Sequence, residues 1–200
     1  RWDDGVSGSR KVPNAKYINK TSTGDYSTVG IGATYDMNEN LKLVAGFHQG
    51  MSPVFNGDAE EADNIELGFR YNKGTTALEV MYFSSDYANL VAECKNSNGG
   101  DCDPGDTFDG GEVDVSGLEV DASWVVQGDG VSFPLAVTFT STDATFENSF
   151  DSDYFGVVAS GDDLPYIPSS VLAISAGFVT EDGWSGYLRM ADHGSSCSTA

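Results

Sequence analysis

Hydrophobic alternation with a period of two dominates this 200-residue chain and limits what it can fold into. The alternation is clearest in residues 64–71, NIELGFRY, where every second side chain is apolar. The same pattern predicts further strands at residues 28–35, 41–48, 77–83, 118–124, 135–139, 172–178 and 184–190. We found no segment with a convincing helical period. The sequence therefore predicts an all-β protein, an antiparallel meander of about eight strands.

The connections between these strands alternate strictly between short and long. The short ones are residues 36–40, 72–75, 127–134 and 181–183, and the long polar ones are 49–62, 91–111 and 147–168. A soluble β-sandwich is not expected to show this alternation of connection lengths. An outer-membrane barrel does, because its short turns face the periplasm and its long loops face outside. The connection lengths therefore favour a membrane barrel.

Aromatic residues on the apolar rows support the same interpretation. Each of the following lies within a few residues of a short connection: Tyr35, Tyr71, Trp124, Phe178 and Trp184. Aromatic rings at one level form a girdle at the headgroup boundary of a membrane barrel. The alternative is that they are core residues of a soluble β-sandwich. The opposite rows weaken that alternative, because Gly, Thr, Ser and a few charged residues suit a polar lumen better than a solvent face.

Charge and composition exclude several classes of protein. With 31 acidic against 10 basic residues and a net charge of −21, the chain lacks the basic surface that nucleic-acid binding needs. The same charge argues against docking to an anionic lipid surface. The 11 Phe, 9 Tyr and 3 Trp residues oppose disorder. The longest charge-free run, residues 164–180, contains two prolines and is shorter than the ~20 residues of a membrane-spanning helix.

Two of the three cysteines lie close together in a polar segment, CKNSNGGDC. We expect Cys94 and Cys102 to form a disulfide clip in an oxidising compartment, contributing about 2–3 kcal/mol on the loop-entropy model. Zinc binding is less favoured, because the two histidines, His48 and His193, both lie far from this pair in the sequence.

The sequence contains no catalytic motif of the G-x-S-x-G, H-E-x-x-H or phosphate-loop type. We therefore predict no enzymatic activity, no cofactor and no resident metal. The abundant carboxylates are interpreted as solvated loop charges. The alternative is a calcium site, because hard cations prefer oxygen ligands on flexible loops. Its ligands would be Asp101, Asp103, Asp106 and Asp109.

Five segments in a fixed order resemble the barrel of TonB-dependent outer-membrane receptors. They are GFHQGMSP (46–53), NIELGFRY (64–71), SSDYANLV (84–91), GGEVDVSGLEVDASW (110–124) and LPYIPSSVLAISAGF (164–178). The resemblance covers roughly residues 24–190. Within this family, the loop from Cys94 to Cys102 followed by FDGGE is similar to the ferric dicitrate transporter branch.

The resemblance implies a ~22-stranded barrel in the outer membrane of a Gram-negative bacterium, surrounded by lipid and filled by an N-terminal plug. Such receptors bind a ferric chelate outside and import it with energy passed through TonB. The chain departs from the pattern, because it shows no plug, no TonB-contacting segment and no final aromatic-ended strand. We therefore expect residues 1–200 to be a partial barrel domain from its C-terminal half. Cys197 would then pair beyond the end of the chain.

An anionic ferric chelate needs basic or polar contacts. The best candidates are Arg10, Lys11, Lys16 and Lys20 in the first long segment, with His48 and Gln49 where a strand meets a long loop. The alternatives are ordinary surface lysines for the first four and a plug-contacting or hydrated side chain for His48, which strand parity directs into the lumen. Arg70 and Glu66 share one strand face, and we expect them to pair with barrel neighbours or the plug.

Small residues dominate the rows predicted to face inward. They are Thr28, Gly30, Gly32, Thr34, Gly46, Gly68, Ser123, Ala136, Thr138, Ser175 and Gly177. Because a closed eight-stranded barrel fills its interior with side chains, such rows would leave voids. We therefore predict an open sheet in which the strand near residues 26–35 does not pair with that near 184–190. A β-bulge is expected near Gly117, since Val113 and Val115 have the other parity from Leu118.

Two other functions remain open at the level of sequence. One is a complete, small eight-stranded outer-membrane barrel that acts as an adhesin or structural anchor. The other is a secreted soluble β-protein that binds calcium or carbohydrate.

Overall fold

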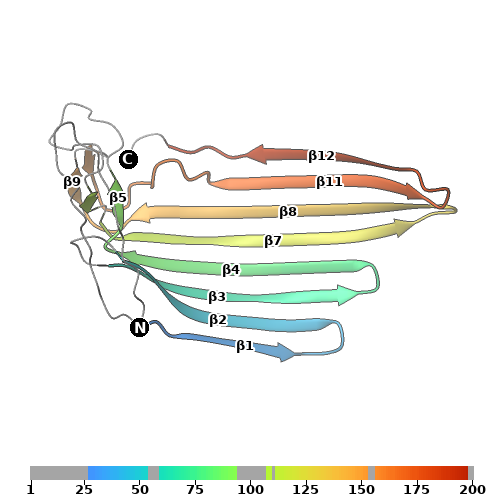
Figure 1. Cartoon of the computed structure of the whole chain (residues 1–200), viewed down its shortest axis with the longest axis horizontal. Coiled ribbons are helices and arrows are strands. Elements are labelled where there is room, and N and C mark those ends of the chain that lie inside the picture. Colours follow the sequence, from blue (N-terminus) through green and yellow to red (C-terminus); the bar gives the residue numbers. More distant parts are fainter. Residues whose placement is uncertain (1–26, 54–58, 94–106, 110, 153–155, 198–200) are drawn as a thin grey trace, which may run out of the picture.

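Eight long strands form one antiparallel sheet in the computed structural model, which describes residues 27–53, 59–93, 107–109, 111–152 and 156–197 (Figure 1). They are β1 (Gly30–Asp36), β2 (Leu41–Ser52), β3 (Glu60–Lys73), β4 (Thr76–Ala88), β7 (Val113–Gln127), β8 (Val131–Phe146), β11 (Ser170–Thr180) and β12 (Ser185–His193). Their order in the sheet follows their order in the sequence. The predicted meander of eight strands is confirmed. The described residues include no helix long and apolar enough to cross a membrane.

Strand pairing brings all the predicted apolar rows to the same face of the sheet. Residues directly opposite one another in an antiparallel pair project to the same side. Leu67 of β3 lies opposite Ala45 of β2 and Tyr82 of β4, and Tyr82 lies opposite Leu118 of β7. The ladders keep one register along each pair of strands, so this relation holds along their length. We call this side the apolar face and the other side the polar face.

The apolar face is a continuous, exposed hydrophobic surface. Its large exposed side chains are Ile31, Tyr35, Leu43, Ile65, Leu67, Tyr82, Leu118, Val126, Phe133, Phe178, Leu188 and Met190. Soluble monomers rarely expose an apolar patch of more than a few hundred Å². On β7 the row runs from Leu118 to Val126, about 26 Å at ~3.3 Å per residue, which matches the ~25 Å apolar band of a membrane barrel.

The predicted aromatic girdle lies at one end of this face. The register places Tyr35, Tyr71, Trp124 and Phe178 on the apolar face close to the short connections. Trp184 lies in the connection between β11 and β12 and is 75% exposed. Amphipathic rings at the end of an apolar band are the arrangement expected at a headgroup boundary.

The short and long connections lie at opposite ends of the sheet (Figure 1). Residues 37–40, 74–75, 128–130 and 181–184 form the short turns. Gly74 has a φ of +60°, which lets two residues close the hairpin between β3 and β4. All the long connections, 53–59, 89–112 and 147–169, leave the other end. The predicted alternation is confirmed, although the first long connection is shorter than predicted because residues 49–52 and 60–62 belong to β2 and β3. We call the second end the loop end.

The sheet is open, as predicted. β1 and β12 are its two edges, and within the described residues each pairs with a single strand, β2 and β11 respectively. A strand at the edge of a sheet presents a row of backbone N–H and C=O groups to which a further strand can pair, and a closed barrel has no such edge.

The predicted bulge near Gly117 is wrong. Gly117 lies opposite Phe83 of β4 and Thr142 of β8, and both ladders run through it without a break in register. Val113 and Val115 therefore lie on the polar face. These two valines are apolar because other side chains cover the polar face at the loop end, so that apolar residues are buried on that face there.

A small hydrophobic core covers the polar face at the loop end. Val113 of β7, Phe146 of β8 and Val158 are each 1% exposed and pack together. Partly buried side chains surround them: Tyr87, Leu90, Val115, Phe150 and Leu164. We call these eight residues the mouth cluster. Two short ribbons lie at this end, β5 (Val91–Glu93) with β6 (Thr107–Asp109) and β9 (Phe150–Ser152) with β10 (Gly156–Val158).

Candidate functional site

A row of charged and polar side chains crosses the polar face on six neighbouring strands. Its members lie directly opposite one another in the ladders: Asp36, Lys42, Arg70, Glu79, Asp121 and Thr138. The row forms three local pairs. Lys42 Nζ lies 3.0 Å from Asp36 Oδ1, Arg70 binds Glu79, and Thr138 Oγ1 donates to Asp121 Oδ2 over 2.9 Å. A hydrated, charged surface of this kind suits a lumen.

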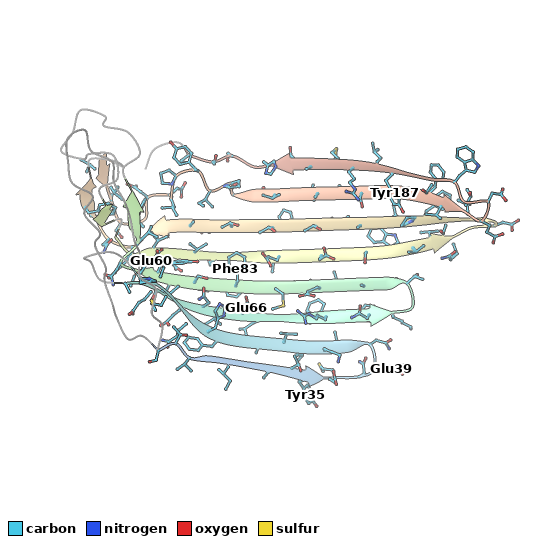
Figure 2. The ribbon with its side chains drawn as sticks, in the orientation of Figure 1. Tyr35, Glu39, Glu60, Glu66, Phe83 and Tyr187 are labelled. Carbon is cyan, nitrogen blue, oxygen red and sulfur yellow. The ribbon has the colours of Figure 1, made fainter. Side chains whose placement is uncertain are left out.

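Arg70 is the most heavily engaged cation of the row. Its Nε and Nη2 donate to the two carboxylate oxygens of Glu79 over 2.9 and 3.0 Å. This bidentate geometry fits the planar guanidinium group and leaves Arg70 fewer N–H donors for another anion. The expectation that Arg70 pairs with a barrel neighbour is confirmed for Glu79. Glu66, four residues earlier on the same face, lies opposite Phe83 (Figure 2).

Large side chains of the polar face lie over glycines on the neighbouring strand. Phe83 covers Gly117, Met81 covers Gly68, and Tyr187 covers Gly177. A Cβ built at Gly117 would lie 2.8 Å from Phe83 Cε1. These glycines therefore provide room for close packing across strands.

The two candidate ligand contacts in β2 lie on opposite faces. His48 projects from the polar face, as strand parity predicted, and its carbonyl oxygen accepts a hydrogen bond from Asn64 Nδ2 over 3.1 Å. Gln49, the next residue, projects from the apolar face, where its Nε2 donates to Asp63 Oδ1 over 2.9 Å. The sheet thus does not direct both side chains towards one ligand on the polar side. Ligand binding by either stays a prediction.

Most of the other predicted site residues lie outside the described part of the chain. They are Arg10, Lys11, Lys16 and Lys20, the proposed clip Cys94 and Cys102, and Asp101, Asp103 and Asp106. The backbone of Asp109 belongs to β6. In the part that the structure describes, no group of three or more His, Cys, Asp or Glu side chains is placed to hold a metal ion.

Cys197, also in the described part, lies at the surface as a free thiol. Its Sγ donates to Asp163 Oδ2 over 3.6 Å, and its carbonyl oxygen accepts from the Tyr166 N–H over 2.8 Å. The residue therefore belongs to a backbone pairing between the segment after β12 and the segment before β11. Its expected pairing with a second cysteine stays a prediction.

A row of carboxylates on the apolar face, just beyond the hydrophobic band, is a feature that sequence reasoning missed. Asp63, Asp86 and Asp114 lie directly opposite one another on β3, β4 and β7. Glu147 follows the end of β8 at the same end of the sheet. The charge of Asp86, followed by desolvation and the charges of Asp114 and Glu112, raises the pKa of the Glu147 carboxyl above its ordinary value.

Glu147→Gln is expected to flatten the dependence of stability on pH. Because the pKa of Glu147 is raised in the folded state, its contribution to stability is full below the ordinary carboxyl pKa of about 4.3 and is lost as pH rises through the raised value. Thermal unfolding of the complete protein in detergent, measured between about pH 4 and 8, tests this. Glu39→Gln removes one charge from a turn at the other end (Figure 2) and serves as the control. An unchanged pH slope in Glu147→Gln contradicts the prediction.

A one-layer sheet with an apolar face, a charged face and all its long connections at one end is the wall of a membrane barrel. The protein-family model described as "TonB dependent receptor-like, beta-barrel" matches residues 1–196. The chain belongs to this family. The family consists of transport receptors of the Gram-negative outer membrane and is not an enzyme family. No curated protein matches the chain at a significant level.

Two solved structures that are similar to this chain are of a transporter from Neisseria meningitidis. The FrpB iron transporter in its F3-3 variant aligns with a TM-score of 0.54 and 19% identity, over 80% of this chain and 26% of its own. The F5-1 variant in its apoprotein form aligns with a TM-score of 0.57 and 18% identity, over 86% of this chain and 28% of its own. The likeness shows the fold. The chain thus spans little more than a quarter of the length of these structures.

Proposed function

We propose that residues 1–200 form part of the wall of an outer-membrane transporter that takes up a ferric chelate with energy supplied through TonB. The observation that carries the proposal is the two-faced open sheet, apolar towards lipid and charged towards the lumen, in a chain that belongs to the TonB-dependent receptor family. The similar structures are those of an iron transporter, which supports iron as the cargo. The loop end is then the extracellular mouth.

The parts of the transporter beyond this wall belong to the same proposal. A plug domain and a TonB-contacting segment would lie N-terminal to residue 1, and further strands would complete the barrel. The share of each FrpB chain that aligns, 26% and 28%, supports a partial barrel domain.

The other two functions considered from the sequence find less support. A complete eight-stranded barrel needs β1 beside β12, and these are the two edges of the sheet. A secreted soluble protein would expose the whole apolar face to water, at a cost of roughly 25 cal/mol for each Å².

For the ligand, we propose an anionic ferric chelate of the ferric dicitrate type. The support is the Cys94–Cys102 segment followed by FDGGE, together with the basic residues Arg10, Lys11, Lys16 and Lys20. On the described sheet, Arg70 and Lys42 are already paired with carboxylates. Arg189 of β12 also projects from the polar face, opposite Ser175, and the first long segment supplies four further basic side chains. His48 on the polar face is the strand residue proposed to contact the chelate.

Uptake by the complete receptor tests this function. Cells that carry or lack the receptor gene, under iron limitation, are given radioactive iron as ferric dicitrate, a ferric hydroxamate or a ferric catecholate. Receptor-dependent and TonB-dependent uptake of at least one chelate is expected, with ferric dicitrate preferred. Loss of the receptor without effect on any chelate overturns the function. Preference for another chelate overturns only the dicitrate assignment.

Replacing the four basic residues of the first segment with glutamine is expected to weaken binding of ferric dicitrate to the purified receptor about tenfold or more, since charge-assisted hydrogen bonds would be lost. Lys73→Gln, at the end of β3 beside a short turn, is the matched control.

A further inference from the structure

An inserted segment interrupts the pairing between β8 and the chain before β11, near the loop end. On one side of the interruption, the Thr142 N–H donates to the Ser169 carbonyl over 3.0 Å. On the other side, the Leu164 N–H donates to the Ala144 carbonyl over 2.8 Å. Four residues, 165–168, therefore lie opposite a single residue of β8, and they must loop away from the ladder.

The chain after β12 pairs with the other side of this inserted segment. The Ser169 N–H donates to the Ser195 carbonyl over 2.9 Å, and the Tyr166 N–H donates to the Cys197 carbonyl over 2.8 Å. Tyr166 has a φ of +66°, a backbone conformation that a bulky residue adopts only when its surroundings impose it. The inserted segment is therefore held in a strained conformation between β8 and the chain after β12.

A cavity of about 170 Å³ lies where these three segments meet. A protein cavity of about 150 Å³ is large enough to hold a molecule of benzene. This cavity therefore has room for a single six-membered ring. Its polar lining residues come from all three segments, and they are Asp143, Asp163, Ser169, Ser195, Ser196 and Cys197.

The two carboxylates of the cavity belong to the side of the sheet that carries the apolar face. Asp163 pairs with Thr145, which lies opposite Asp114 on β7. Asp143 comes two residues before Thr145 on β8, so it projects to the same side. Asp114 belongs to the carboxylate row just beyond the hydrophobic band. The cavity therefore lies at the loop-end edge of this band, near the membrane surface.

The lining suits a small organic cation that also carries hydroxyl groups. It presents two carboxylates and three serine hydroxyls, which can donate and accept, and none of its described residues is basic. The Asp163 carboxylate accepts from the Cys197 thiol over 3.6 Å, and within the described residues no hydrogen bond or ion pair engages that of Asp143. A bare metal ion fits less well, because no three metal-binding side chains of the described chain are close enough to hold one.

We propose that this cavity binds one small hydroxylated primary amine, of the amino-sugar class, with its ammonium group bound by Asp143 and Asp163 and its hydroxyl groups bound by the serines. The same chemistry occurs in a free amino sugar and in the amino-sugar head group of a lipid. The site uses none of the residues proposed to contact the chelate. It therefore goes beyond the proposed function and does not depend on the cargo.

Isothermal calorimetry on the complete receptor in detergent tests the site with glucosamine, glucose and glucuronate, which are similar in size. Glucosamine is expected to bind, and glucose is expected to bind about tenfold more weakly or worse, because it lacks the charge-assisted hydrogen bonds. Glucuronate is expected not to bind, because the two carboxylates repel its charge. Absence of glucosamine binding, or glucose binding as tight as that of glucosamine, overturns the proposal.

Three variants test whether the amine binds in this cavity. Asp143→Asn and Asp163→Asn are each expected to weaken glucosamine binding about tenfold. Asp182→Asn removes one carboxylate from the short turn between β11 and β12 and is the matched control. Ser196→Phe keeps both carboxylates, fills the cavity and is expected to abolish binding without lowering the thermal unfolding midpoint. Affinities equal to that of the control in these three variants overturn the proposal.

The receptor in lipid vesicles distinguishes the two sources of the amine. If a lipid head group occupies the cavity, vesicles whose lipids carry glucosamine are expected to weaken the binding of free glucosamine about tenfold or more, relative to vesicles whose lipids carry glucose. Equal affinity in the two kinds of vesicle assigns the site to a free amino sugar.

Discussion

Val120→Arg is expected to destabilise the membrane-inserted protein by about 2–4 kcal/mol, the penalty for arginine near the bilayer midplane on the lipid face of a barrel. Val120 lies opposite Val80 and Phe139, inside the apolar band of β7. Leu67→Arg on β3 is expected to behave in the same way, because Leu67 is half exposed within the same band. Unfolding of the complete receptor in lipid vesicles by denaturant measures the change in free energy.

The matched control is Glu119→Arg, one residue earlier on β7. Glu119 lies opposite Met81 and Thr140 on the polar face, where water solvates a charge. We expect its replacement to cost far less than that of Val120. Equal losses for Val120→Arg and Glu119→Arg would show that the two faces are wrongly assigned.

Gly117→Val is expected to destabilise the sheet by about 1–3 kcal/mol, the range seen when extra atoms are forced into a packed site. A Cβ at this position would press on the Ser141 carbonyl oxygen and on the ring of Phe83. The Ser141 carbonyl oxygen belongs to the backbone of β8, so it cannot move away from the new side chain as the end of a flexible side chain could. Reduced barrel assembly, read as loss of the heat-modifiable form on gels, and a lower denaturation midpoint are the expected results.

Gly32→Val separates this steric effect from a general effect of valine on the polar face. A Cβ at Gly32 would come no closer than 3.9 Å to the Ala45 carbonyl oxygen. Since valine favours strands more than glycine does, this variant is expected to be neutral or slightly stabilising. A stability loss at Gly32 as large as that at Gly117 would refute the steric explanation.

Some features of the candidate site followed from sequence and some did not. Parity along β2 directed His48 to the polar face, and the structure places it there. The same parity places Gln49 on the apolar face, where it donates to Asp63, a contact that needs the register between β2 and β3. The interpretation of Val113 and Val115 as evidence of a bulge failed, because sequence did not show that a long connection would cover the polar face.

The sequence by itself determined the strands, their meander order and the face of most side chains, with Val113 and Val115 as exceptions. A strand has a period of two, so the identities of alternate residues decide which side meets lipid. The alternation of short and long connections then predicted that the short turns lie at one end of the sheet and the long connections at the other. Both signals are local and need no knowledge of pairing partners.

Only the tertiary structure decided which residues stand beside one another across strands. Sliding a strand by two residues leaves every side chain on its face but gives each a new neighbour, so alternation cannot distinguish such registers. The placement of Phe83 over Gly117, the row of Asp63, Asp86 and Asp114, and the mouth cluster around Phe146 all depend on that choice. Their partners come from segments far apart in sequence, joined by connections whose conformation depends on the packing they form.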